Sequence, residues 1–173
     1  TIPVKLFSFR VFKTRFTSIS LKYFVQMKKF IIVLFLGLVS CNSGEAVDIF
    51  QRDFKENRWS KNDLRRLTFS IEENANYNID LHLGHIYEYQ FDVIPLQVTL
   101  FKDEQILFQE TIDVKVKENG KDLGECVGDI CDLYALLKQD YNLEKGFYSL
   151  QIENKFDREY LPNILGIGVR IKK

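Results

Sequence analysis

Apolar and polar residues alternate over most of the chain after residue 66, and this pattern restricts the fold more than any other feature of the sequence. Successive side chains of a β-strand point to opposite faces, so such alternation predicts strands that bury one face only. The runs, separated by turn residues, are at 67–71, 77–83, 96–100, 106–108, 112–116, 148–152 and 165–171. They predict an all-β fold, namely a single antiparallel β-sandwich of immunoglobulin-like or jelly-roll-like type, with a barrel as the second choice.

The segment DICDLYALLKQDY (129–141) fits either of two structures. It could form a short helix with Asp129 or Asp132 as the N-cap residue, because aspartate accepts hydrogen bonds from the free backbone N–H groups of a first turn. It also fits a strand through Leu133. The sequence alone leaves both structures open.

The last run contains two glycines, Gly166 and Gly168, between apolar residues. One face of this strand therefore lacks side chains, and glycine within a strand often marks the close approach of another group. We expect a large aromatic side chain from the facing layer to fill the bare face, and a partner's strand is the alternative.

Residues 27–41, MKKFIIVLFLGLVSC, have the pattern of a secretory signal. Two lysines precede an apolar run of eleven residues, 30–40. This run is shorter than the ~20 residues that span a bilayer. Because Met27 is the only methionine, we interpret residues 1–26 as an upstream extension of the reading frame, with a long n-region or a transit peptide as alternatives. The predicted organisation is an extension at 1–26, a lipoprotein signal peptide at 27–40, a short tether at 41–48 and a β-sandwich domain at 49–173.

The tetrapeptide LVSC, which ends at Cys41, resembles a bacterial lipobox. We predict that the Cys41 thiol carries the diacylglycerol of a lipoprotein, since a thioether needs sulfur at this position. The alternative is a buried N-terminal helix that ends at an incidental cysteine. Asn42 stands where an aspartate commonly retains a lipoprotein in the inner membrane. The predicted location is therefore the cell envelope, with a lipid anchor in the outer membrane and the domain facing the periplasm.

The balanced charge of the whole chain conceals an acidic mature domain. Residues 1–40 contain seven Lys and Arg and no acidic residues, which leaves 17 basic against 24 acidic side chains in residues 41–173, a net charge of −7. Nucleic acids and anionic membranes bind clustered Lys and Arg, so we expect no nucleic-acid partner. The 133 residues are enough for one domain with a single core.

Three residues are candidates for sites other than the anchor. Cys126 and Cys131, in ECVGDIC, could close a small disulfide ring in an oxidising compartment, and a pair of free thiols is the alternative. Trp59 is the only tryptophan. It either fills one end of the sandwich or stacks on a carbohydrate or a docking partner, and its exposure would distinguish these roles.

No motif in the sequence indicates catalysis. His82 and His85 are the only histidines, and in a strand they would point to opposite faces, so they do not form a metal site without a bulge at Gly84. Neither a Gly-x-Ser-x-Gly elbow nor a glycine-rich phosphate loop is present. We therefore predict no enzyme activity, no catalytic residues, no metal site and no cofactor, and a hydrolase built on scattered carboxylates is the minority hypothesis.

Several segments together resemble the GldH family of gliding-motility lipoproteins. They are NRWSKND (57–63), YNIDLHL (77–83), GECVGDI (124–130), GFYSLQIEN (146–154) and LPNILGIGVRIKK (161–173). The resemblance runs from about Cys41 to the C-terminus. It implies a β-sandwich and a non-enzymatic, membrane-anchored component of gliding and of the associated secretion apparatus.

Our leading hypothesis is thus a lipoprotein that acts as a structural or assembly component of the gliding machinery. Its expected partners are the membrane, through the lipid anchor, and other envelope proteins of gliding and secretion. The alternative is an envelope lipoprotein that binds a carbohydrate or another ligand through Trp59 and loop tyrosines such as Tyr87, Tyr89 and Tyr160.

Overall fold

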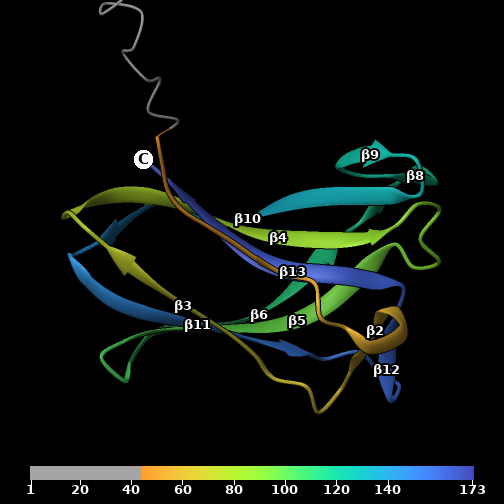
Figure 1. The fold of residues 1–173 in the computed structure, drawn as a ribbon, viewed down its shortest axis with the longest axis horizontal. Coiled ribbons are helices and arrows are strands. Elements are labelled where there is room, and N and C mark those ends of the chain that lie inside the picture. The colour runs from red at the N-terminus through yellow and green to blue at the C-terminus, as the bar shows by residue number, and fades with distance from the viewer. Residues whose placement is uncertain (1–43) are drawn as a thin grey trace, which may run out of the picture. The chain divides into compact units, whose positions relative to one another are not determined.

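Two antiparallel sheets pack face to face in the computed structural model, which describes residues 44–173 (Figure 1). One sheet has the strand order β1-β13-β4-β10-β9 and the other β3-β11-β5-β6. The strands are β1 (Glu45–Gln51), β2 (Arg58–Ser60), β3 (Arg65–Ile71), β4 (Ala75–Ile86), β5 (Val93–Lys102), β6 (Gln105–Lys115), β7 (Lys117–Glu118), β8 (Lys121–Asp122), β9 (Glu125–Val127), β10 (Ile130–Leu143), β11 (Gly146–Asn154), β12 (Tyr160–Pro162) and β13 (Ile164–Lys172). A 3-10 turn, η1 (Lys55–Asn57), precedes β2. The predicted all-β sandwich is confirmed.

The alternating runs supply the core between the two sheets. In β3 the residues Leu67, Phe69 and Ile71 are buried and their neighbours are exposed. The odd-numbered residues of β4 from Tyr77 to His85 are buried in the same way. Because each strand buries one face, the inner faces of the two sheets meet in one apolar cluster.

Two short segments extend the sandwich at one end. There β2 pairs with β12, and the small hairpin of β7 and β8 follows β6 (Figure 1). The opposite end holds the start of β1 and the C-terminus, where the Lys173 N–H donates to the Gly44 carbonyl at 3.1 Å. The first described residues therefore lie beside the last ones.

The ambiguous segment 129–141 is a strand. It forms most of β10, which pairs with β4 over nearly the full length of both strands. The helix interpretation is wrong because Leu133 and its neighbours bury alternate residues against the other sheet, which gives a period of two.

The runs 106–108 and 112–116 were expected to be separate, but most of both lie in a single strand, β6. Among the strands of the described domain, this one is the edge of the four-stranded sheet and pairs with β5 alone. Ile106 is 57% exposed, since the edge position removes the cover that an interior strand would have.

An aromatic side chain fills the bare glycine face, but it does not come from the facing layer. Phe50 of β1 lies directly opposite Gly168 on the neighbouring strand, on the outside of the sandwich. A Cβ atom at Gly166 would lie 2.4 Å from the Phe50 ring, and one at Gly168 would lie 2.1 Å from the Ile49 carbonyl oxygen. The absence of a side chain at Gly168 lets Phe50 reach across β13 and stack on His82 of β4, with ring centroids 3.9 Å apart.

Candidate functional site

Trp59 lies at the end of the sandwich where β2 pairs with β12, directly opposite Leu161. Its side chain is fully buried, and its indole N–H donates to the Asp63 carbonyl at 2.8 Å. The buried Asn154 amide donates to the Trp59 carbonyl at 2.9 Å. A buried indole has no free face for a sugar or a partner, so its burial favours a framework role for Trp59.

An ion-paired arginine beside Trp59 was not found from the sequence. Arg65 is 8% exposed and pairs with both Asp53 and Asp63. Its guanidinium lies over the Phe54 ring at 4.1 Å, and Phe54 in turn packs on Trp59. This arrangement pairs a buried cation with two carboxylates, which offset the cost of removing its charge from water. The alternation of residues in the strands does not predict this ion pair, because the two aspartates that contact Arg65 lie in loops.

The segment between β4 and β5 closes the same end. The Tyr89 hydroxyl donates to the Pro162 carbonyl at 3.0 Å, and burial raises the pKa of this hydroxyl above its ordinary value. The Ile86 N–H donates to the Asn163 carbonyl at 3.1 Å. Of the tyrosines considered for ligand binding, Tyr89 is buried, whereas Tyr87 and Tyr160 are partly exposed.

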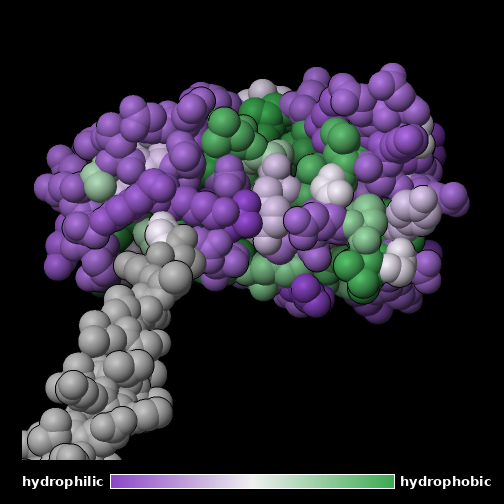
Figure 2. All heavy atoms as spheres, turned by 90° about the horizontal axis from the view of Figure 1, so that it is seen from above, coloured by the Kyte–Doolittle hydropathy of each residue, from purple (hydrophilic) through white to green (hydrophobic). Residues whose placement is uncertain are grey.

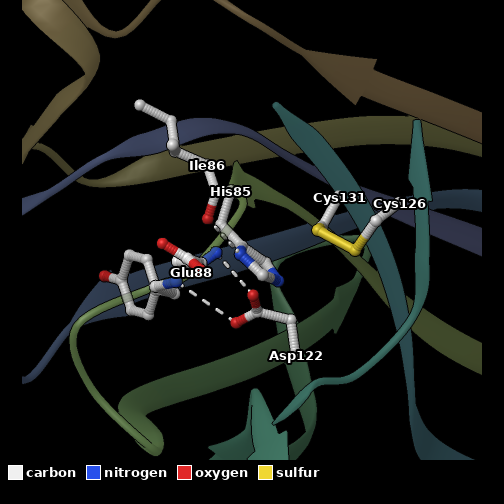
Figure 3. The surroundings of a disulfide bond; sticks show 7 residues. His85, Ile86, Glu88, Asp122, Cys126 and Cys131 are labelled. Atoms are coloured by element: carbon white, nitrogen blue, oxygen red, sulfur yellow. Dashed lines mark hydrogen bonds between the residues drawn. A yellow bond between two sulfur atoms is a disulfide. The ribbon is translucent and has the colours of Figure 1, made fainter. Parts of the chain in front are cut away.

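A disulfide joins Cys126 and Cys131 at this end (Figure 3). The two cysteines are directly opposite each other on β9 and β10, with their Cα atoms 4.0 Å apart. The nearby Asp122 carboxylate accepts hydrogen bonds from the backbone N–H groups of Glu88 and Tyr89. The disulfide and the aspartate thus hold the β9–β10 hairpin and the loop after β4 in fixed conformations.

His82 and His85 point to opposite faces of β4. His85 lies on the inner face, is fully buried, and has its Nδ1 atom 3.0 Å from the Ile86 carbonyl. His82 lies on the outer face between the rings of Phe50 and Tyr134. In residues 44–173, no group of three or more His, Cys, Asp or Glu side chains is placed to hold a metal ion.

His82 provides a pH-dependent contribution to stability. Burial lowers the pKa of its imidazole below the ordinary value of 6.5, although the hydrogen bond to Asp132 opposes this effect. The unfolded chain therefore binds a proton more readily than the folded protein, so stability is complete above pH 6.5 and falls as the pH drops below it.

We expect the free energy of unfolding of the wild-type protein to fall more between pH 7.5 and 5.5 than that of a His82→Gln variant. The introduced amide does not titrate, so it cannot take up the proton that favours the unfolded wild-type chain. Urea unfolding at the two pH values measures the difference. An equal fall in both proteins would show that another group titrates.

The predicted anchor residue, Cys41, lies outside the described residues, as do the predicted extension at 1–26 and the signal peptide at 27–40. In the part of the chain that the structure describes, no helix is long and apolar enough to cross a membrane.

Residues 49–171 match the family model described as GldH lipoprotein. The chain belongs to the GldH lipoprotein family. This is a lipoprotein family related to gliding motility, and it is not a known enzyme family. The GldH match covers nearly all of the described sandwich, which confirms the resemblance seen in the sequence.

Other comparisons give weaker similarities. Dimeric latent PorU from Porphyromonas gingivalis shares 10% identity at a TM-score of 0.33, over 73% of this chain and 12% of that chain. The infectious bursal disease virus VP2 subviral particle shares 8% identity at a TM-score of 0.25, over 72% of this chain and 31% of that chain. The chain thus spans about an eighth of the length of the PorU chain. The curated proteins gave no match.

The structure brings together segments on which the GldH resemblance rests. The segment 57–63 contributes β2, which pairs with β12 from the segment 161–173. The segment 124–130 contributes β9 and its turn, where the Asp129 carbonyl accepts a hydrogen bond from the Tyr87 N–H at 3.0 Å. These motifs therefore meet at one end of the sandwich, where Trp59 is packed as framework.

Proposed function

We propose that this chain is a non-enzymatic lipoprotein that serves as a structural or assembly component of the gliding machinery and of the associated secretion apparatus. In this proposal Cys41 carries the lipid, and the domain is attached to the outer membrane and faces the periplasm. The observation that carries the proposal is the GldH family match over residues 49–171.

The packing of the family motifs supports a framework role for them. Trp59 and Leu161 are fully buried and paired across β2 and β12, and Asn154 holds the Trp59 carbonyl. These contacts stabilise the domain at the end where the motifs meet. We infer that the motifs maintain the shape of the sandwich and that the protein acts through its surface.

The proposed lipid determines where this surface acts. Cys41 is four residues from Glu45, where β1 begins, and an extended chain of four residues spans at most ~14 Å. The domain would therefore stay close to the lipid surface. Two or three acyl chains give stable anchoring, and confinement to the membrane raises the effective concentration beside other envelope proteins.

Deletion of the gene in its native host tests the proposal. We expect the deletion strain to lose colony spreading and single-cell gliding, or export of secreted cargo if the host does not glide. Wild-type protein should restore the lost property and Cys41→Ser should not, because the unlipidated protein leaves the membrane. A Ser43→Ala variant, which keeps the lipobox, is the matched control and should restore it. A deletion strain with normal gliding and secretion would contradict the proposal.

A further inference from the structure

Four apolar side chains lie exposed along the outer face of β9 and β10. Exposed fractions are 83% for Val127, 47% for Ile130, 36% for Tyr134 and 56% for Leu136. Val127 and Ile130 are directly opposite each other across the two strands, so they share one face. Cys131 and Leu133 point inward and are buried. We call the four exposed residues the β10 stripe.

The β10 stripe interrupts the pattern expected of a solvated sheet. The outer face of an antiparallel sheet is normally polar, because only the inner face is packed. Seen from above, hydrophobic side chains gather in the middle of the molecule and toward the end that holds β9, whereas the opposite end is mostly hydrophilic (Figure 2). Exposed apolar patches with polar rims mark interaction sites.

The stripe is held in place before any partner binds. The disulfide between Cys126 and Cys131 fixes β9 against β10. Tyr134 stacks on His82 with ring centroids 4.3 Å apart, and the Arg170 guanidinium lies 3.4 Å from the Tyr134 ring centre. A surface that is already ordered loses little conformational entropy on binding, which favours affinity.

The outer end of the stripe lies far from the start of β1. Glu45 is opposite Lys172, and Lys172 is opposite Asn78 near the start of β4. Ile130, by contrast, is opposite Ile86 at the end of β4. Eight residues of strand separate Asn78 from Ile86, or about 26 Å at ~3.3 Å per residue. With the lipid on Cys41, as the proposed function has it, the stripe extends away from the membrane.

Charge at the outer end of the stripe, around Val127 and Ile130, favours a basic partner. Glu125 and Asp129 are exposed beside Val127 and Ile130, and Asp132 lies between Ile130 and Tyr134. The residues after the predicted signal carry a net charge of −7. Two copies of this face would bring like charges together, and an anionic lipid surface would be repelled.

The edge of β10 is less suited to binding than its face. Within residues 44–173, no strand pairs with its outer edge beyond Asp132, because β9 covers only residues 130–132. The pairing of β10 with β4 is irregular between Leu136 and Lys138 and again between Lys138 and Tyr141. Such bulges disfavour the addition of another strand.

We propose that the β10 stripe is the docking surface for another protein of the envelope, one that presents an apolar patch ringed by lysine or arginine. The four stripe residues pack against the apolar patch of the partner. Glu125 and Asp129 lie next to the lysine or arginine side chains around that patch. The placement away from the membrane, the envelope location of the partner and the spreading test rest on the proposed function, whereas the stripe and its charge do not.

A matched pair of variants in the full-length protein tests the role of the stripe. Leu136 and Ile106 are 56% and 57% exposed, and Ile106 lies on the other sheet. We expect colonies that carry Leu136→Arg to spread no better than the deletion strain. The amount of this variant in the membrane and its melting temperature should be unchanged. Colonies that carry Ile106→Arg should spread like wild type. Normal spreading of Leu136→Arg, or an equal loss in both variants, overturns the inference but leaves the proposed function intact.

Photo-cross-linking in the native host tests the partner's chemistry and does not depend on gliding. A photoreactive residue at position 136 should form an adduct with a different protein at a peptide rich in Lys or Arg, and the same residue at position 106 should not. Glu125→Lys should reduce the adduct about tenfold. Asp113→Lys, an exposed carboxylate change on β6, should leave it unchanged. An adduct with a second copy of the chain or with lipid, or none at position 136, overturns the inference.

Discussion

Gly168→Ala is expected to lower the free energy of unfolding by about 3 kcal/mol. The added Cβ would lie 2.1 Å from the Ile49 carbonyl oxygen and 2.9 Å from the Phe50 ring. A backbone oxygen cannot turn aside as a flexible side chain can, so β1 must move away from β13. That movement also separates Phe50 from His82, which loses the stacking contact between them.

Urea unfolding followed by circular dichroism measures this loss. Gly128→Ala is the matched control, because Gly128 has a φ of 61° but no atom within 4 Å of an added Cβ. Its expected loss is the left-handed backbone strain alone, about 1 kcal/mol. If Gly168→Ala is no less stable than Gly128→Ala, the close contact of β1 with β13 is not rigid and our account of the glycine face fails.

Trp59→Ala is expected to lower the free energy of unfolding by about 3–5 kcal/mol. The indole of Trp59, on β2, is fully buried, and it packs on Phe54 at a centroid distance of 5.3 Å. Its removal leaves a cavity at the end of the sandwich where the family motifs meet. Phe54 also loses its contact with the indole, and the Arg65 guanidinium packs on the Phe54 ring of this same cluster.

Tyr160→Ala provides the comparison for Trp59→Ala. Tyr160 lies on β12 next to Leu161 and is 38% exposed, with Arg58 over its ring at 4.9 Å. We expect a loss of no more than about 1 kcal/mol, because most of its contacts are at the surface. Thermal unfolding of both variants decides the matter. A Trp59→Ala protein with wild-type stability would restore a surface role for the indole.

The sequence predicts the strands well where one face is buried against the other sheet. The runs around Leu67, Tyr77 and Leu150 alternate because their inward residues pack in the same core. Alternation with a period of two therefore predicts both the strand and its buried face. The sequence could not assign 129–141, because leucines on both faces of β10 weaken the alternation.

Features that depend on which strands are neighbours could not be predicted. The aromatic side chain over Gly168 comes from β1, which pairs with β13 although the two strands lie at opposite ends of the described sequence. The exposure of Ile106 follows from the edge position of β6. The β10 stripe consists of ordinary strand residues, and the sequence does not show that Leu136 is exposed on the outer face of the described sandwich.

The mass of the protein purified from the membranes of its native host tests the central claim most directly. The account predicts a mature chain whose first residue is Cys41, with the mass increase of a diacylglyceryl group and any further acyl chain on that residue. A chain that keeps the residues before 41 and carries an unmodified Cys41 thiol would contradict it.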